Sequence, residues 1–104
     1  MIINVTKDNF EKEVIQSDVP VLVDFWAAWC APCRMQGEIL EKFVGTLGKD
    51  KAKIVKIDVD TEQSLAYEYQ IMSIPTLMAF KDGKVISKQI GVSNDDKLRS
   101  MLGV

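Results

Sequence analysis

The pattern of hydrophobic and polar positions along the chain predicts five β-strands. Two of the apolar stretches are continuous runs, as expected for strands that are covered on both faces of a sheet. The five expected strands are residues 2–5, 21–26, 52–59, 76–80 and 85–90. The last two flank Asp82-Gly83, a pair typical of a tight hairpin turn, so we expect these two strands to be antiparallel.

The longest helical pattern follows Pro32. Apolar residues recur there at the three- and four-residue spacing of an amphipathic helix, and Gly48 is its expected end. The apolar residues of this pattern are Met35, Ile39, Leu40, Phe43, Val44 and Leu47. The five methionines of the chain share no helical spacing, so we interpret them as core residues rather than a binding stripe.

Three shorter helices are expected between and after the strands. Asp8 with Glu11, and Ser93 with Asp96, have the spacing of capping boxes at the starts of the first and the last helix. The first helix should bury Phe10 and Val14, which lie four positions apart. The ranges expected for the other two helices are residues 61–69 and 95–102.

The order of these elements indicates an α/β fold. Parallel βαβ units followed by a hairpin and a terminal helix imply a mixed five-stranded sheet flanked by four helices, in the order βαβαβαββα. The chain has 104 residues, of which 47% are hydrophobic and 27% charged, so we expect a single domain over residues 1–104.

The charge pattern disfavours two classes of partner. The formal charge of −2 is spread along the chain, which leaves no basic face for a nucleic acid or an anionic membrane. Residues 1–10 lack a positively charged start followed by an apolar run, and Asp24 interrupts the apolar stretch 19–29. We therefore expect a cytoplasmic protein that binds neither nucleic acid nor membrane. We also expect it to be a monomer.

The only two cysteines, Cys30 and Cys33, are the main candidates for chemistry, since the chain contains no histidine. A bridge between them closes too small a loop to stabilise the fold by constraining the unfolded chain. A tetrahedral zinc site needs four ligands, so no metal is expected. A cysteine hydrolase needs a basic partner that this chain lacks. The spacing therefore favours redox chemistry.

The stretch Trp29-Cys30-Ala31-Pro32-Cys33 lies between a predicted buried strand and an amphipathic helix, which is the context of a redox C-x-x-C site. Four further stretches of the sequence also match the pattern of a known protein family: Val23 to Ala27, Ile74-Pro75-Thr76, Phe80 to Gly83, and Gly91. On these residues the chain resembles the thioredoxin family along essentially its whole length. The resemblance implies the thioredoxin fold and a thiol-disulfide oxidoreductase that reduces protein disulfides. It also implies no bound cofactor, with recycling by a thioredoxin reductase that uses NADPH.

The position of Cys30 at the start of a helix indicates that it is the attacking thiol. Free backbone N–H groups and the positive end of the helix dipole stabilise a thiolate there. Cys33 lies one turn further along and can displace the reduced substrate from the mixed disulfide. The Ala31-Pro32 pair adds no positive charge to stabilise the thiolate further, so we expect a reductant.

Asp24 breaks an apolar strand, where a carboxylate is costly unless it is paired or protonated. The resemblance implies that Asp24 accepts a proton near Cys33, with Lys56 nearby. An alternative remains open at this point, in which Asp24 lies in water at a strand edge and Lys56 is an ordinary surface charge.

The resemblance also predicts the substrate-binding side of the site. It implies a cis peptide bond before Pro75 and a backbone at Ile74 that pairs with a substrate strand. The sequence alone leaves a plain turn proline possible. We expect Trp26 to pack beneath an apolar collar around Cys30. The collar residues are Trp29, Pro32, Ile74, Gly91 and Val92.

The chain departs from the usual family pattern at two places. Ala31 stands where the family usually has glycine. In the middle of the active-site helix, Glu38, preceded by Gly37, stands where the family usually has proline. We therefore expect a less kinked helix with a weak point at Gly37. Two other functions stay open, a disulfide isomerase or oxidase and a redox-independent chaperone or complex subunit.

Overall fold

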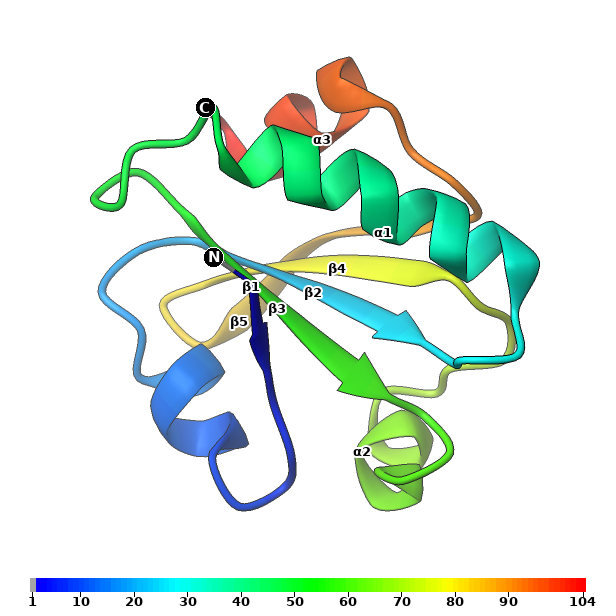
Figure 1. Cartoon of the computed structure of the whole chain (residues 1–104). Coiled ribbons are helices and arrows are strands. Elements are labelled where there is room, and N and C mark those ends of the chain that lie inside the picture. Colours follow the sequence, from blue (N-terminus) through cyan, green and yellow to red (C-terminus); the bar gives the residue numbers. More distant parts are fainter. Residues whose placement is uncertain (1) are drawn as a thin grey trace.

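The computed structural model describes residues 2–104, and its five strands form one mixed sheet with helices on both faces (Figure 1). The strand order is β1-β3-β2-β4-β5, with β1 and β5 at the edges. The pairs β1–β3 and β2–β3 are parallel, and β2–β4 and β4–β5 are antiparallel. The strands are β1 (Ile2–Asn4), β2 (Val21–Trp26), β3 (Lys53–Asp58), β4 (Thr76–Lys81) and β5 (Lys84–Ile90).

Four helical elements cover the two faces of this sheet, as predicted. They are η1 (Glu11–Ile15), α1 (Ala31–Val44), α2 (Gln63–Glu68) and α3 (Asp95–Leu102). In Figure 1, α1 and α3 lie on one side of the sheet, and η1 and α2 lie on the other. The predicted α/β class and element order are therefore confirmed, and none of the helices within residues 2–104 is long and apolar enough to cross a membrane.

Strand β2 lies at the centre of the sheet and explains its own apolar run. Leu22 packs in the apolar cluster under α1 and α3, whereas Val23 and Phe25 pack in the cluster on the opposite face. Because successive side chains of a strand point to opposite faces, Asp24 lies on the same side as Leu22, toward α1. The ionisable residue Asp24 thus lies on the face of the sheet that the longest helix, α1, covers.

The first helix differs from its prediction. Phe10 and Val14 are buried as expected, but no side chain caps the start of η1. Asn9 accepts the Thr6 N–H instead (2.7 Å), which closes a turn before the helix begins. The capping box predicted at Asp8 is therefore wrong, because Asp8 lies inside this turn and the N-cap of η1 is Phe10.

The last helix occupies its predicted range, but its cap is one residue further along. Asn94 Oδ1 accepts the N–H of Lys97 (3.0 Å), and Ser93 is buried instead of capping the helix. The hairpin turn agrees with its prediction, since Asp82 and Gly83 both have positive φ, 52° and 78°.

Helix α1 is unbroken but shorter than predicted, ending at Val44 rather than near Gly48. Its fully buried side comprises Cys33, Gln36, Leu40 and Phe43. Met35, predicted to face the core, is 58% exposed, so that prediction is wrong. Because Cys33 lies on the buried side of α1, Gln36, three residues further along, is buried as well, and Met35 faces solvent.

The methionines are not all core residues. Met78 and Met101 are buried, whereas Met35 and Met72 are exposed, Met72 at 91%. The interpretation as core residues is therefore wrong for two of the methionines that the structure describes. Each exposed methionine lies two residues from one of the sequence motifs described above. Met35 is two residues after Cys33, and Met72 is two residues before Ile74.

Candidate functional site at the start of helix α1

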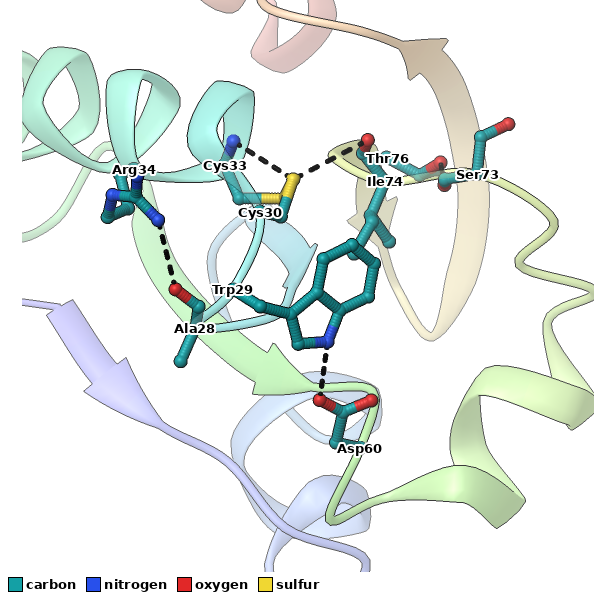
Figure 2. The surroundings of a disulfide bond; sticks show 9 residues. All are labelled: Ala28, Trp29, Cys30, Cys33, Arg34, Asp60, Ser73, Ile74 and Thr76. Carbon is teal, nitrogen blue, oxygen red and sulfur yellow. Dashed lines mark hydrogen bonds between the residues drawn. A yellow bond between two sulfur atoms is a disulfide. The ribbon is translucent and has the colours of Figure 1, made fainter.

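Cys30 and Cys33 form a disulfide where β2 gives way to α1 (Figure 2). Cys30 is the N-cap of α1, with an extended backbone (φ −93°, ψ 111°), and its Sγ accepts the N–H of Cys33 at 3.2 Å. Pro32 lies in the first turn, where a missing N–H costs no helical hydrogen bond. The local sequence therefore presents one sulfur to the free N–H groups of the helix.

The segment before β4 lies against this disulfide. Cys30 Sγ is 3.9 Å from the carbonyl oxygen of Ile74, and the peptide bond between Ile74 and Pro75 is cis, as the resemblance implied. The N–H of Gly91, directly after β5, donates to the Pro75 carbonyl (2.9 Å). Two loops that are distant in the sequence thus meet beside Cys30.

Asp24 is fully buried, so the alternative of an exposed strand edge is wrong. Neither carboxylate oxygen has a hydrogen-bond partner within residues 2–104. Burial raises the pKa of this carboxyl from 3.8 to about 7, and the positive charge of Lys56 opposes the rise. The group can therefore gain or lose a proton near neutral pH, beneath the helix that carries Cys33.

Lys56 is paired with Asp24 in the register of β2 and β3. Its Nζ lies 4.1 Å from the centre of the Trp26 ring, a cation–π contact. A Cβ on Gly37 would lie 3.9 Å from the same Nζ, which places the ammonium beside α1. Lys56 is thus half-buried between sheet and helix.

The two tryptophans occupy different depths. Trp26 packs against the buried group formed by Ala27 and the two cysteines, as expected for the residue beneath the collar. Trp29 is 70% exposed, and its indole N–H donates to Asp60 Oδ2 at 2.8 Å. Figure 2 shows the Trp29 indole near the disulfide with its N–H directed to Asp60.

A shallow apolar groove of about 190 Å³ lies beside the disulfide. Its lining residues are Trp29, Val59, Ile71, Met72, Ser73 and Ile74. Of the predicted collar, Trp29 and Ile74 line this groove, Pro32 is exposed next to Cys30, and Gly91 with the exposed Val92 follows β5. The structure therefore distributes the predicted collar over the groove, the first turn of α1 and the loop after β5.

Sequence reasoning missed Asp60 and Gln36. Asp60 follows β3 and Trp29 follows the parallel strand β2, so both lie at the carboxyl edge of neighbouring strands. That shared edge was a usable signal. Gln36 follows Cys33 by three residues on the buried stripe of α1, and a polar residue on such a stripe was a second signal.

The described part of the chain offers redox chemistry rather than metal chemistry. Within residues 2–104, no three His, Cys, Asp or Glu side chains gather as a metal site requires. The disulfide accepts two electrons and becomes a dithiol whose first sulfur faces the helix N–H groups. The site can therefore exchange a disulfide with another molecule.

A protein-family model described as Thioredoxin matches residues 1–103. The chain belongs to the thioredoxin family. Thioredoxins are disulfide oxidoreductases, and the Cys30–Cys33 pair gives this chain protein-disulfide reductase activity without a bound cofactor. The resemblance inferred from the sequence is thus confirmed.

Individual thioredoxins are similar over almost the whole chain. Thioredoxin C-2 of Corynebacterium nephridii is 43% identical over 101 residues, which are 97% of this chain and 93% of the relative. The thioredoxin of Staphylococcus haemolyticus is 46% identical and covers 97% of this chain and 94% of its own. Thioredoxin 1 of Synechococcus elongatus is 46% identical over 84% of this chain and 80% of the relative.

Proposed function

We propose that Cys30 attacks disulfides of other proteins and that Cys33 resolves the resulting mixed disulfide. The observation that carries this assignment is the hydrogen bond from the Cys33 N–H to Cys30 Sγ at the start of α1. In the reduced protein, the same N–H and the helix dipole would stabilise a Cys30 thiolate. Cys33 is the more enclosed of the two, 2% against 5% exposed, which suits the resolving thiol.

The exchange takes two displacements. The Cys30 thiolate attacks one substrate sulfur, so an S–S bond forms between them and the other substrate sulfur leaves as a thiolate. The Cys33 thiolate then attacks Cys30 Sγ, forming the Cys30–Cys33 disulfide and releasing the second substrate sulfur. Two electrons pass to the substrate, whose two sulfurs take up two protons.

Asp24 is the proposed acceptor for the proton that Cys33 must lose before the second displacement. Its buried position toward α1 and its pKa of about 7 support this role. Lys56, its register neighbour, would moderate the pKa of the carboxyl through its positive charge. The route between the carboxyl and Cys33 would run beneath the first turn of α1.

The substrate chain would bind across the two loops beside Cys30. The Ile74 backbone would pair with an extended substrate segment, and Pro75 in cis presents that backbone toward the sulfur. Apolar contacts would come from the rest of the collar: Trp29, Pro32, Gly91 and Val92. Such contacts demand little sequence preference from the partner.

The oxidised protein would be returned to the dithiol by a thioredoxin reductase that takes its electrons from NADPH. Protein disulfides and this reductase are thus the proposed partners. We place the protein in the cytoplasm as a monomer, in keeping with its dispersed charge and dithiol chemistry.

Insulin reduction with dithiothreitol as the electron source tests this function. We expect rapid insulin reduction, complete loss of turnover in Cys30→Ser, and a trapped mixed disulfide in Cys33→Ser that mass spectrometry detects. The reduction potential should lie well below about −180 mV, the value of protein disulfide isomerase.

Two results would contradict this function. A potential near that of the isomerase would favour an isomerase or oxidase. A double Cys→Ser variant that kept the full cellular or binding activity would favour a redox-independent chaperone or complex subunit.

A further inference from the structure

Gln36 joins the active-site helix to the loop after β5. Its Oε1 accepts the N–H of Ser93 at 2.6 Å, and its Nε2 donates to the Ser93 carbonyl at 3.1 Å. Both residues are buried, and they lie 57 positions apart in the sequence. One side chain thus satisfies the donor and the acceptor of a single distant backbone residue.

The loop held by Gln36 spans residues 91–93 and connects β5 to α3. In Figure 1 this segment, drawn in orange, runs alongside the first half of α1. At its other end, the Gly91 N–H is bonded to the carbonyl of Pro75. The loop is therefore tied to α1 at one end and to the segment beside Cys30 at the other.

The exposed residue between these two ties is Val92. Gly91 has φ +90° and open space around its Cα, so the loop has little side-chain packing of its own at that point. An apolar residue at position 36 could fill the buried space but would offer no partner to the Ser93 backbone. The glutamine amide therefore fixes where the loop lies relative to the helix.

We infer that Gln36 is a positioning residue for the substrate chain. By holding Ser93 on the helix that carries both cysteines, it keeps Val92 and Gly91 in a fixed place relative to Cys30. The inference rests on the proposed function, since it concerns how a protein disulfide docks there. Gln36 would act through the loop and would not contact the reacting sulfurs.

The test compares the parent with Gln36→Met, which keeps the side-chain length but cannot bond the Ser93 backbone. The reduced proteins are mixed with insulin in a stopped-flow instrument, and the reaction rate is followed against insulin concentration. We expect the half-saturating concentration to rise about three- to tenfold, with a limiting rate within about twofold of the parent. Amide hydrogen exchange at Val92 and Ser93 should become faster.

Phe43→Leu is the matched control, because Phe43 is fully buried on the same helix in the apolar cluster between α1, α3 and the sheet. It should lower stability without changing the half-saturating concentration. Gln36→Asn keeps the amide but shortens its reach, and it should shift that concentration in the same direction as Gln36→Met. This second variant serves if Gln36→Met does not fold.

The outcomes separate this inference from the proposed function. An unchanged half-saturating concentration in the Gln36 variants, or an equal rise in Phe43→Leu, would overturn the positioning role. Failure of the parent protein to reduce insulin would instead overturn the proposed function itself.

Discussion

Asp24 keeps a charge-bearing group in the centre of the sheet, where folding gains nothing from it. An acid whose pKa is raised in the folded protein destabilises the fold once the pH exceeds its unfolded value. For Asp24 the loss begins near its ordinary pKa of 3.8 and is complete above about 7. The carboxyl is therefore costly in the pH range where the proposed exchange takes place.

Replacing Asp24 with asparagine removes this cost. We expect Asp24→Asn to raise the free energy of unfolding by on the order of 2–4 kcal/mol at about pH 8, with little change near pH 4. Urea unfolding at the two pH values measures the difference. A variant whose stability followed pH as the parent's does would show that Asp24 is not the titrating group.

The same variant also separates stability from chemistry. If Asp24 accepts the Cys33 proton, Asp24→Asn should slow the release of the mixed disulfide near neutral pH, and the loss should shrink as the pH approaches the ordinary pKa of a thiol, about 8.5. Single-turnover kinetics with a Cys33-containing mixed disulfide measures this step. A more stable protein with an unchanged release rate would remove the proposed role.

Individual residues also show how much of the site could be predicted from the sequence. The cysteine pair and the misplaced carboxylate of Asp24 stand out in the sequence because their chemistry conflicts with a structural role. The position of Gln36 on the apolar stripe of the helix was a weaker signal of the same kind. Its bonds to Ser93 carried no signal, since the partner lies 57 positions away and nothing local in the sequence indicates that the two residues meet.

Among the elements, α1 combines the site with the core. Its first turn carries the cysteines, and Leu40 and Phe43 in its second half pack against the sheet. Gly37 lies between these two parts, where a glycine loosens a helix. A Cβ at this position would meet only Lys56 Nζ, at 3.9 Å, which is an ordinary contact.

We therefore expect Gly37→Ala to raise the free energy of unfolding by about 0.5–1 kcal/mol. Urea unfolding checks this value. The control is Gly103→Ala at the end of α3, where φ is +71° and an alanine should be destabilising. A loss of stability in Gly37→Ala would show that the helix needs the glycine for its packing against Lys56.

The element boundaries show where local signals suffice. All strand limits and those of α2 and α3 agree with the sequence pattern to within two residues. The caps of the first and last helices were missed, because an asparagine adjoins each predicted cap residue. Asn9 Oδ1 accepts the Thr6 N–H before the first helix, and Asn94 Oδ1 accepts the Lys97 N–H at the start of the last one. Where two residues that can cap a helix are adjacent, the local sequence alone does not decide which of them does so.

At the scale of the whole molecule, the topology brings the carboxyl ends of β2, β3 and β5 and the start of β4 to the end of the sheet that carries the proposed site. Sequence blocks at Cys30, Ile74 and Gly91 meet there, although they lie far apart along the chain. The family resemblance, which rests on these blocks, predicted that they lie together. The groove residues Ile71 and Met72 were missed, because a single apolar residue in a loop carries no signal of exposure. Val59 was missed because the apolar pattern places it in the predicted strand 52–59, whereas β3 ends at Asp58.

Met72 tests the importance of this groove for docking. We expect Met72→Ser to raise the half-saturating insulin concentration by about two- to fivefold. In the parent an apolar partner would cover the exposed thioether, and the serine variant loses this apolar contact. The assay is the stopped-flow measurement with reduced protein. Val85→Ser is the control, since Val85 is also exposed but pairs with Phe80 at the opposite end of β4. Equal effects of the two substitutions would contradict a docking role for the groove.

The open edge of the sheet at β5 bears on aggregation. An edge strand offers unpaired N–H and C=O groups that a second chain can extend, and exposed Ile86 and Ile90 would favour such stacking. Lys84 and Lys88 lie along this strand, and its pairing with β4 is irregular at Ala79 and Phe80. Lysines and irregular pairing both hinder edge-to-edge growth. The protein can thus keep the end of its sheet that carries the proposed substrate site open to other chains, while the edge strand β5 discourages polymerisation with its own copies.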